Sequence, residues 1–153
     1  MDVTKKVPVR EQAPDVRNKN FDEVCLGYNE EEAVLEASRC INCKNAQCIK
    51  GCPVSINIPA FVHEVKEKNF EAAYKIIGQS SALPAVCGRV CPQESQCEGK
   101  CIRGIKGEAI SIGKLERFVA DWARQNQIKP EKSTEKKNKK VAVIGSGPSG
   151  LTC

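Results

Sequence analysis

The sequence predicts an all-α domain over residues 25–126. Apolar residues recur at helical spacing in four segments of this range, and no segment between them alternates as a strand. Nine of the ten cysteines lie here, whereas Trp, Tyr and Phe together supply only seven of 153 residues. A chain so rich in thiols and poor in aromatics is typically held by disulfides, zinc or iron–sulfur clusters instead of apolar burial.

Caps and apolar spacing place four helices in this domain. The first begins after Asn29, has three glutamates in its first turn and runs to Cys40. Pro59 suits the first turn of the second helix, and Asn69 can cap the third. The last helix covers about 111–126. The first helix contains the apolar residues Ala33, Val34, Leu35 and Ala37. The apolar residues at helical spacing in the later helices are Phe61, Val62, Val65, Ala72, Ala73, Ile76, Ile77, Ile112, Leu115, Phe118, Val119 and Trp122.

Three further zones flank this domain. Residues 1–24 carry two prolines and little periodicity, which indicates an extended arm. Residues 127–140 hold six lysines and two glutamates, so this Lys-rich linker carries most of the formal charge of +5, and we expect no nucleic-acid binding. No apolar leader or membrane-spanning run is visible. The thiols are therefore expected in a reducing, cytoplasmic compartment, where metal binding is more usual than disulfides.

Eight cysteines form two groups of four. Their spacing is Cys40-x2-Cys43-x4-Cys48-x3-Cys52 and Cys87-x3-Cys91-x5-Cys97-x3-Cys101. Proline follows Cys52 and Cys91, as it follows the last cysteine of bacterial ferredoxin runs, which ligates the other of two clusters. Zinc favours two short pairs instead, so the spacing favours two [4Fe-4S] clusters over a zinc-stabilised interaction module. Interleaved basic residues could partly offset the clusters' negative charge: Arg39, Lys44, Lys50, Arg89, Lys100 and Arg103.

Two [4Fe-4S] clusters (cubanes) need eight ligands, and the residues alone do not identify the eighth ligand. Cys25 and Cys153 stand outside both groups and are interpreted as buried or free thiols, so the other eight cysteines permit an all-thiolate solution. Glu116 is the competing candidate, because no cation lies three or four residues from it on an otherwise apolar helix face. From spacing alone, the preferred interpretation of Glu116 is an ordinary surface residue on a partly wet face.

Residues 141–153 open a second kind of structure. The apolar run 141–144 is followed by glycines at the spacing of a dinucleotide-binding fingerprint. In that motif Gly145 allows the tight turn, Gly147 lets pyrophosphate approach the backbone and Gly150 allows close packing of helix on strand. Because the sequence stops at Cys153, we expect the frayed first strand and glycine turn of a truncated Rossmann-type FAD/NAD(P)-binding domain, and hence a fragment of a longer protein.

With these residues in view, the chain resembles the N-terminal iron–sulfur domain of the small (beta) subunit of NADPH-dependent glutamate synthase. The same module is similar to the N-terminal domain of dihydropyrimidine dehydrogenase and to the large subunit of NADH-dependent ferredoxin:NADP oxidoreductases. The resemblance rests on Pro14, Arg17, Asn20-Phe21, Glu23-Val24, Gly27-Tyr28, Glu36-Ala37, Arg39-Cys40, Cys43, Cys52-Pro53, the stretch from Cys87 to Pro92, and the stretch from Val143 to Leu151.

The resemblance implies an α-helical ferredoxin-like electron-transfer module with two [4Fe-4S] clusters, ahead of an FAD- and NADPH-binding region. It implies one cluster on Cys40, Cys43, Cys48 and Cys101, and another on Cys52, Cys91, Cys97 and Glu116, with Cys87 left as a small buried residue. In such an oxidoreductase, NADPH reduces FAD, and electrons pass through the clusters to the glutamate-forming large (alpha) subunit. Another NAD(P)H flavin oxidoreductase is the alternative parent. The fragment alone is expected to be catalytically inactive.

Overall fold

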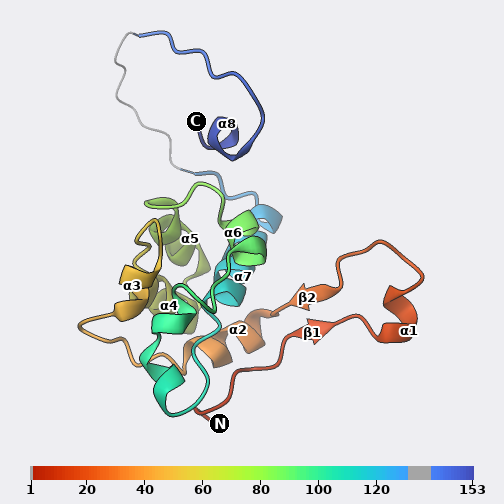
Figure 1. Ribbon diagram of the computed structural model, residues 1–153, viewed down its shortest axis with the longest axis vertical. Coiled ribbons are helices and arrows are strands. Elements are labelled where there is room, and N and C mark those ends of the chain that lie inside the picture. The colour runs from red at the N-terminus through yellow and green to blue at the C-terminus, as the bar shows by residue number, and fades with distance from the viewer. Residues whose placement is uncertain (1, 131–138) are drawn as a thin grey trace.

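Four helices pack around an apolar core in the computed structural model, which describes residues 2–130 and 139–153 (Figure 1). They are α2 (Glu30–Ala37), α4 (Ile58–Lys66), α5 (Phe70–Gly78) and α7 (Ile112–Gln125), so each predicted helix is confirmed. Phe61, Val65, Ile77, Leu115 and Val119 are fully buried among them. This core corrects the expectation that apolar burial would be replaced by other links: it exists, and aliphatic side chains supply most of it.

Local interactions explain where these helices begin. The Asn29 side chain accepts a hydrogen bond from the Glu32 backbone N–H, and the Glu32 carboxylate accepts one from the Asn29 N–H, a capping box that starts α2. Pro59 lies in the first turn of α4 as predicted. Asn69 occupies the N-cap position of α5 as predicted, but its side chain makes no capping hydrogen bond, and its amide donates to the Glu64 carboxylate at 3.0 Å.

The cysteine-bearing segments contain short helices that periodicity did not reveal. They are α3 (Gln47–Gly51), α6 (Pro84–Val90) and the 3-10 turns η1 (Glu98–Lys100) and η2 (Ile102–Ile105). Segments of three to seven residues are too short to show a helical repeat. The longest of them, α6, packs on α7 so closely that a Cβ at Gly88 would lie 2.7 Å from the Arg117 backbone nitrogen. Glycine at this position therefore makes the contact possible.

The fold departs from a wholly helical one at the N-terminal arm. Strand β1 (Arg10–Glu11) pairs antiparallel with β2 (Cys25–Gly27), and α1 (Pro14–Arg17) lies in the connection between them. Figure 1 shows this hairpin projecting from the helical body. Both strands are too short for alternation to be recognised in the sequence. An ion pair between Arg89 and Glu23, at 2.8 Å, ties the arm to α6.

The C-terminal residues form helix without sheet. Residues 141–144 are exposed and, within the described ranges, pair with no strand, and α8 (Pro148–Thr152) follows the glycine turn. Gly145 has a φ of +113°, in keeping with a tight turn. Of the expected linker 127–140, residues 131–138 lie outside the described residues. In the described part of the chain, no helix is long and apolar enough to cross a membrane.

Candidate metal centres

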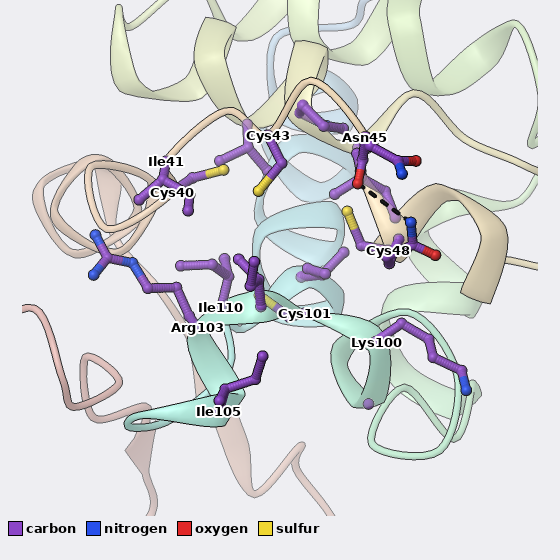
Figure 2. A pocket seen from close by; sticks show the side chains of 18 residues that line it. Cys40, Ile41, Cys43, Asn45, Cys48, Lys100, Cys101, Arg103, Ile105 and Ile110 are labelled. Atoms are coloured by element: carbon purple, nitrogen blue, oxygen red, sulfur yellow. Dashed lines mark hydrogen bonds between the residues drawn. The ribbon is translucent and has the colours of Figure 1, made fainter.

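The first candidate centre is a pocket lined by four of the predicted cysteines. Figure 2 shows Cys40, Cys43 and Cys48 pointing into it from one side, with Cys101 on the opposite side. The cavity has a volume of about 300 Å³. Apart from the thiols its wall is largely aliphatic, with contributions from Ile41, Ala46, Ile58, Pro59, Val62, Ile102, Ile105, Ile110 and Ile112. The pocket therefore offers sulfur donors in surroundings poor in competing polar groups.

Local backbone structure brings the three neighbouring thiols to one side. Asn42 has a φ of +50°, a left-handed conformation that turns the chain between Cys40 and Cys43. Cys48 lies in α3, and Cys101 arrives from distant sequence at the junction of η1 and η2. A loop that supplies three corners while remote sequence supplies the fourth is the arrangement that the cysteine spacing predicts.

Burial makes this pocket unfavourable for thiolate charge without a cation. It raises the pKa of the Cys48 thiol to about 11, and the neighbouring Cys101 and Cys40 thiols raise it further through charge repulsion. Burial also raises the pKa of Cys40, while the nearby Arg103 guanidinium opposes the shift. Because metal ligation requires deprotonated sulfur, a positive metal centre is what would stabilise four thiolates together.

The second candidate centre is assembled from residues near helix ends. Cys52 ends α3, Cys91 ends α6, Cys97 precedes η1, and Glu116 projects from α7. Burial raises the pKa of Cys91 to about 11, and charge repulsion from Cys87, Glu116 and Cys52 adds to the shift. The pKa of Cys97 rises to about 12, chiefly by burial, with Cys52 and Glu116 again among the neighbouring charges. Cys52 and Glu116 thus lie close enough to Cys91 and Cys97 to affect the pKa of both thiols.

Glu116 is the residue whose environment differs most from the spacing-based interpretation. Its side chain is only 7% exposed, and its Oε1 atom is buried without a hydrogen-bond partner. Burial raises the pKa of its carboxyl group to about 7. The interpretation of Glu116 as a wet surface residue was therefore wrong. An orphaned carboxylate oxygen is costly in a protein interior unless a cation meets it, so this atom fits a metal ligand.

Donor spacing separates the two kinds of metal centre. Among the residues that the structure describes, no three His, Cys, Asp or Glu side chains lie close enough to hold one metal ion. Zinc would draw its ligands into a tetrahedron with Zn–S distances of about 2.3 Å. The ligands of a [4Fe-4S] cubane each bind a different iron and so stand farther apart, around the outside of the cluster. A single zinc ion would therefore require the described donors to move closer together.

Two of the six basic residues expected to offset cluster charge have other roles. Arg39 is fully buried and pairs with the equally buried Glu36. Arg89 pairs with Asp121 at 2.8 Å, in addition to its contact with the arm. Arg103 does line the first centre, where its Nε donates to the Arg39 carbonyl at 2.7 Å. Proximity in sequence to a cysteine was thus a poor guide to the partner of a basic side chain.

Glu98 is a residue near the second centre that sequence reasoning missed. It directly follows Cys97 and is 7% exposed. Its carboxylate accepts a hydrogen bond from Lys6 Nζ at 2.6 Å and another from the Gly113 N–H at 3.2 Å. These contacts tie the N-terminal segment and α7 to the Cys97 loop. Nothing in the spacing distinguishes this glutamate from the exposed ones around it.

Comparison with known proteins places the chain among iron–sulfur proteins. Residues 17–128 match the family described as dihydropyrimidine dehydrogenase domain II, 4Fe-4S cluster. The chain is 39% identical over 143 residues to the putative oxidoreductase AegA of Escherichia coli (strain K12), a match that covers 92% of this chain and 22% of AegA.

Two further relatives carry other enzyme names. The chain is 38% identical over 154 residues to the glutamate synthase [NADPH] small chain of Halomonas elongata, covering 100% of this chain and 32% of the relative. It is 38% identical over 131 residues to the NAD-dependent dihydropyrimidine dehydrogenase subunit PreT of E. coli (strain K12), covering 86% of this chain and 32% of PreT. The chain thus spans about a fifth to a third of the length of these relatives.

Proposed function

Because the chain belongs to the family of dihydropyrimidine dehydrogenase domain II, a 4Fe-4S cluster domain, we propose that it relays electrons through two [4Fe-4S] clusters. The observation that carries this proposal is the separation of eight donors into two sets. One set lies around the cavity of about 300 Å³, and the other includes the orphaned oxygen of Glu116. Two centres side by side in one small domain suit a relay better than a single structural metal.

The proposed ligands follow the two sets. The first cluster is assigned to Cys40, Cys43, Cys48 and Cys101, which line one pocket, and the second to Cys52, Cys91, Cys97 and Glu116, which influence one another's charge. Glu116 is preferred to Cys87 because its buried Oε1 atom has no hydrogen-bond partner, whereas the Cys87 sulfur accepts a hydrogen bond from the Ser81 hydroxyl at 3.9 Å.

The chain holds the two proposed clusters next to each other through two short links. Cys48 and Cys52 flank one turn of α3 but belong to different centres, and Cys97 and Cys101 flank η1 in the same way. The clusters supply one-electron transfer when bound. The residues of the chain set the spacing, exclude water with aliphatic side chains and choose the ligand type. Since a carboxylate is a harder ligand than a thiolate, the second cluster should differ from the first in potential.

We assign the relay to an NADPH-dependent glutamate synthase small subunit that also binds FAD and NADPH. The glutamate synthase relative supports this assignment, with the large (alpha) subunit as partner. Residues 25–126 then form the cluster domain, after the arm 1–24, and the linker 127–140 leads to a Rossmann-type domain beginning at 141–153, where Gly145, Gly147 and Gly150 approach the nucleotide. A cytoplasmic location is proposed with it, because cluster ligation requires reduced thiols and a reducing compartment preserves them.

The PreT and AegA relatives favour a second parent, another NAD(P)H flavin oxidoreductase that uses the same relay. The two parents differ in the electron acceptor. We expect the full-length protein, combined with a glutamate synthase large subunit, to form glutamate from 2-oxoglutarate and glutamine at the expense of NADPH. Cluster reduction by NADPH without glutamate formation would assign the relay to the second parent.

Metal analysis of the chain tests the relay itself. After anaerobic reconstitution with iron and sulfide, we expect brown protein with enough iron and acid-labile sulfide for two cubanes. Dithionite should reduce it reversibly, with two redox steps and the electron paramagnetic resonance of reduced [4Fe-4S] clusters. Colourless protein that binds two zinc ions and no sulfide would refute the proposal and favour a structural module without a redox role.

A further inference from the structure

The second centre holds one more donor than a cluster needs. Cys87 is half-buried on α6, and its backbone is fixed because its carbonyl accepts hydrogen bonds from the Cys91 N–H at 3.1 Å and from Gln93 Nε2 at 3.0 Å. Its thiol is held much less firmly. The contact with the Ser81 hydroxyl, which donates to the Cys87 sulfur, is 3.9 Å long. The backbone of Cys87 is therefore fixed, whereas its sulfur atom is held only loosely.

Helix packing brings the chain next to Cys87 against the chain next to Glu116. Helix α6 lies directly on α7 at Gly88, where an added Cβ would meet the backbone of Arg117, the neighbour of Glu116. Cys91 follows Cys87 by four residues, which is one helical turn along the same face. Cys91 in turn senses the charges of both Cys87 and Glu116. The buried Oε1 atom of Glu116 has no hydrogen-bond partner, which independently indicates that a positively charged group binds here.

We propose that Cys87 is a reserve ligand, which takes the corner of the second cluster that Glu116 otherwise holds. This inference rests on the proposed function, because it requires a [4Fe-4S] cluster in the second centre. Cys87 needs only a rotation about its single side-chain torsion, from one staggered rotamer to another, to move its sulfur away from Cys91. The second centre then has two alternative ligand sets on the same backbone, one that includes Glu116 and one that includes Cys87.

The exchange balances without an external reagent. With a cluster bound, the Cys87 thiolate would replace the Glu116 carboxylate as the ligand at this corner, and the thiol proton of Cys87 would pass to the released carboxylate. No electron is transferred in this step. A thiolate donates more electron density to iron than a carboxylate does, so the Cys87-ligated form should have the lower reduction potential.

Metal content of single and double variants tests the proposal. The reconstituted wild type, Glu116→Ala, Cys87→Ala and the double variant are compared, with Cys25→Ala as a matched cysteine replacement outside both centres. We expect all three single variants to keep the full iron and sulfide content, and Glu116→Ala alone to shift one redox step to lower potential. The double variant should lose half of its iron while keeping the redox step of the first cluster, which serves as an internal control for folding.

Thiol labelling gives a second measurement that does not depend on the double variant. The iron-loaded proteins are treated anaerobically with iodoacetamide, and the labelled cysteines are mapped by mass spectrometry. Cys87 should be alkylated in the wild type and protected in Glu116→Ala, whereas Cys25 should react equally in both. Equal labelling of Cys87 in the two proteins would overturn the reserve role.

The other outcomes separate failure of this inference from failure of the proposed function. Loss of half the iron in Glu116→Ala alone, or full iron in the double variant, would show that Cys87 is no reserve ligand while leaving the two-cluster relay intact. Loss of half the iron in Cys87→Ala alone would make Cys87 a permanent ligand, overturning both this inference and the assignment of Glu116. A wild type that takes up no iron would refute the relay and the inference together.

Discussion

The molecule combines two regions that are stabilised by different means. In the apolar region, α2, α4, α5 and α7 bury large side chains such as Phe61 and Ile77 completely. In the cysteine region, formed by α3, η1, η2 and their loops, α3 and η2 bury no residue and η1 buries Glu98. Helices of three to five residues are not stable on their own. We therefore expect cluster binding to supply the stabilisation that side-chain packing supplies in the apolar region.

Helix α7 belongs to both regions and shows how they are joined. Leu115 lies fully buried in the apolar core, and the next residue, Glu116, lies in the second centre with an unpartnered oxygen. Nine of the fourteen residues of α7 are buried, because neighbours cover it on several sides. The apolar region thus acts as the scaffold on which one proposed ligand is fixed, while most of the thiols come from short segments that bury few residues.

Removing the iron should have the largest effect and should affect the two regions differently. With an iron chelator under anaerobic, reducing conditions, we expect α3, η1, η2 and the loops around them to lose amide hydrogen-exchange protection, while α4, α5 and α7 keep theirs. Metal binding at structural sites contributes on the order of 10 kcal/mol to folding, which is more than these short helices can replace. Uniform loss of protection across the chain would show that the two regions are one cooperative unit.

A cavity in the apolar region should have the next largest effect. Ile77→Ala removes a fully buried side chain from α5 and should lower the free energy of unfolding by about 2 to 5 kcal/mol, as measured by urea denaturation of the iron-loaded chain. Leu35→Ala is the matched control, because Leu35 has the same number of carbon atoms but is 44% exposed, and it should cost much less. Iron content should stay unchanged in both variants; loss of iron in Ile77→Ala would indicate that the regions are coupled.

The two regions also differ in how well the sequence predicts them. The longer helices were found because apolar spacing and caps such as Asn29 repeat over two or more turns. Short segments such as α3 and the paired strands of the arm carry no repeat long enough to recognise. The spacing, with proline after Cys52 and Cys91, predicted that each group of four cysteines is shared between two centres, but it could not show which distant residue completes each centre. That assignment required distant contacts, or a family resemblance that summarises them.

Glu116 and Arg39 show a second limit of sequence reasoning. Both were interpreted from their nearest neighbours along the chain. Glu116 is buried in the folded chain, which the residues at helical spacing around it in α7 did not indicate. Arg39 is committed to Glu36 and to the Glu108 carbonyl, at 2.6 Å, so it is not a counter-charge for the adjacent Cys40. In each case the decisive partner comes from packing in three dimensions.

The smallest predicted effect lies at the joint between α6 and α7. Gly88→Ala would place a Cβ 2.7 Å from the Arg117 nitrogen, and because that atom belongs to a helix backbone it cannot move aside cheaply. We expect a loss of about 1 to 3 kcal/mol in unfolding free energy from overpacking. Separation of α6 from α7 also draws Cys91 away from Glu116, so iron in the second centre should fall while the first centre keeps its own.

Gly78→Ala provides the matched control for that experiment. A Cβ at Gly78, the last residue of α5, would meet no atom within 4 Å, so alanine should leave stability unchanged or raise it by up to about 1 kcal/mol through its higher helix propensity. Urea denaturation and iron analysis of both variants separate a steric effect at the joint from the general effect of replacing a helical glycine. If Gly88→Ala kept both stability and full iron content, α6 could shift on α7 without cost. The second centre would then depend on its ligands alone and not on the scaffold beneath it.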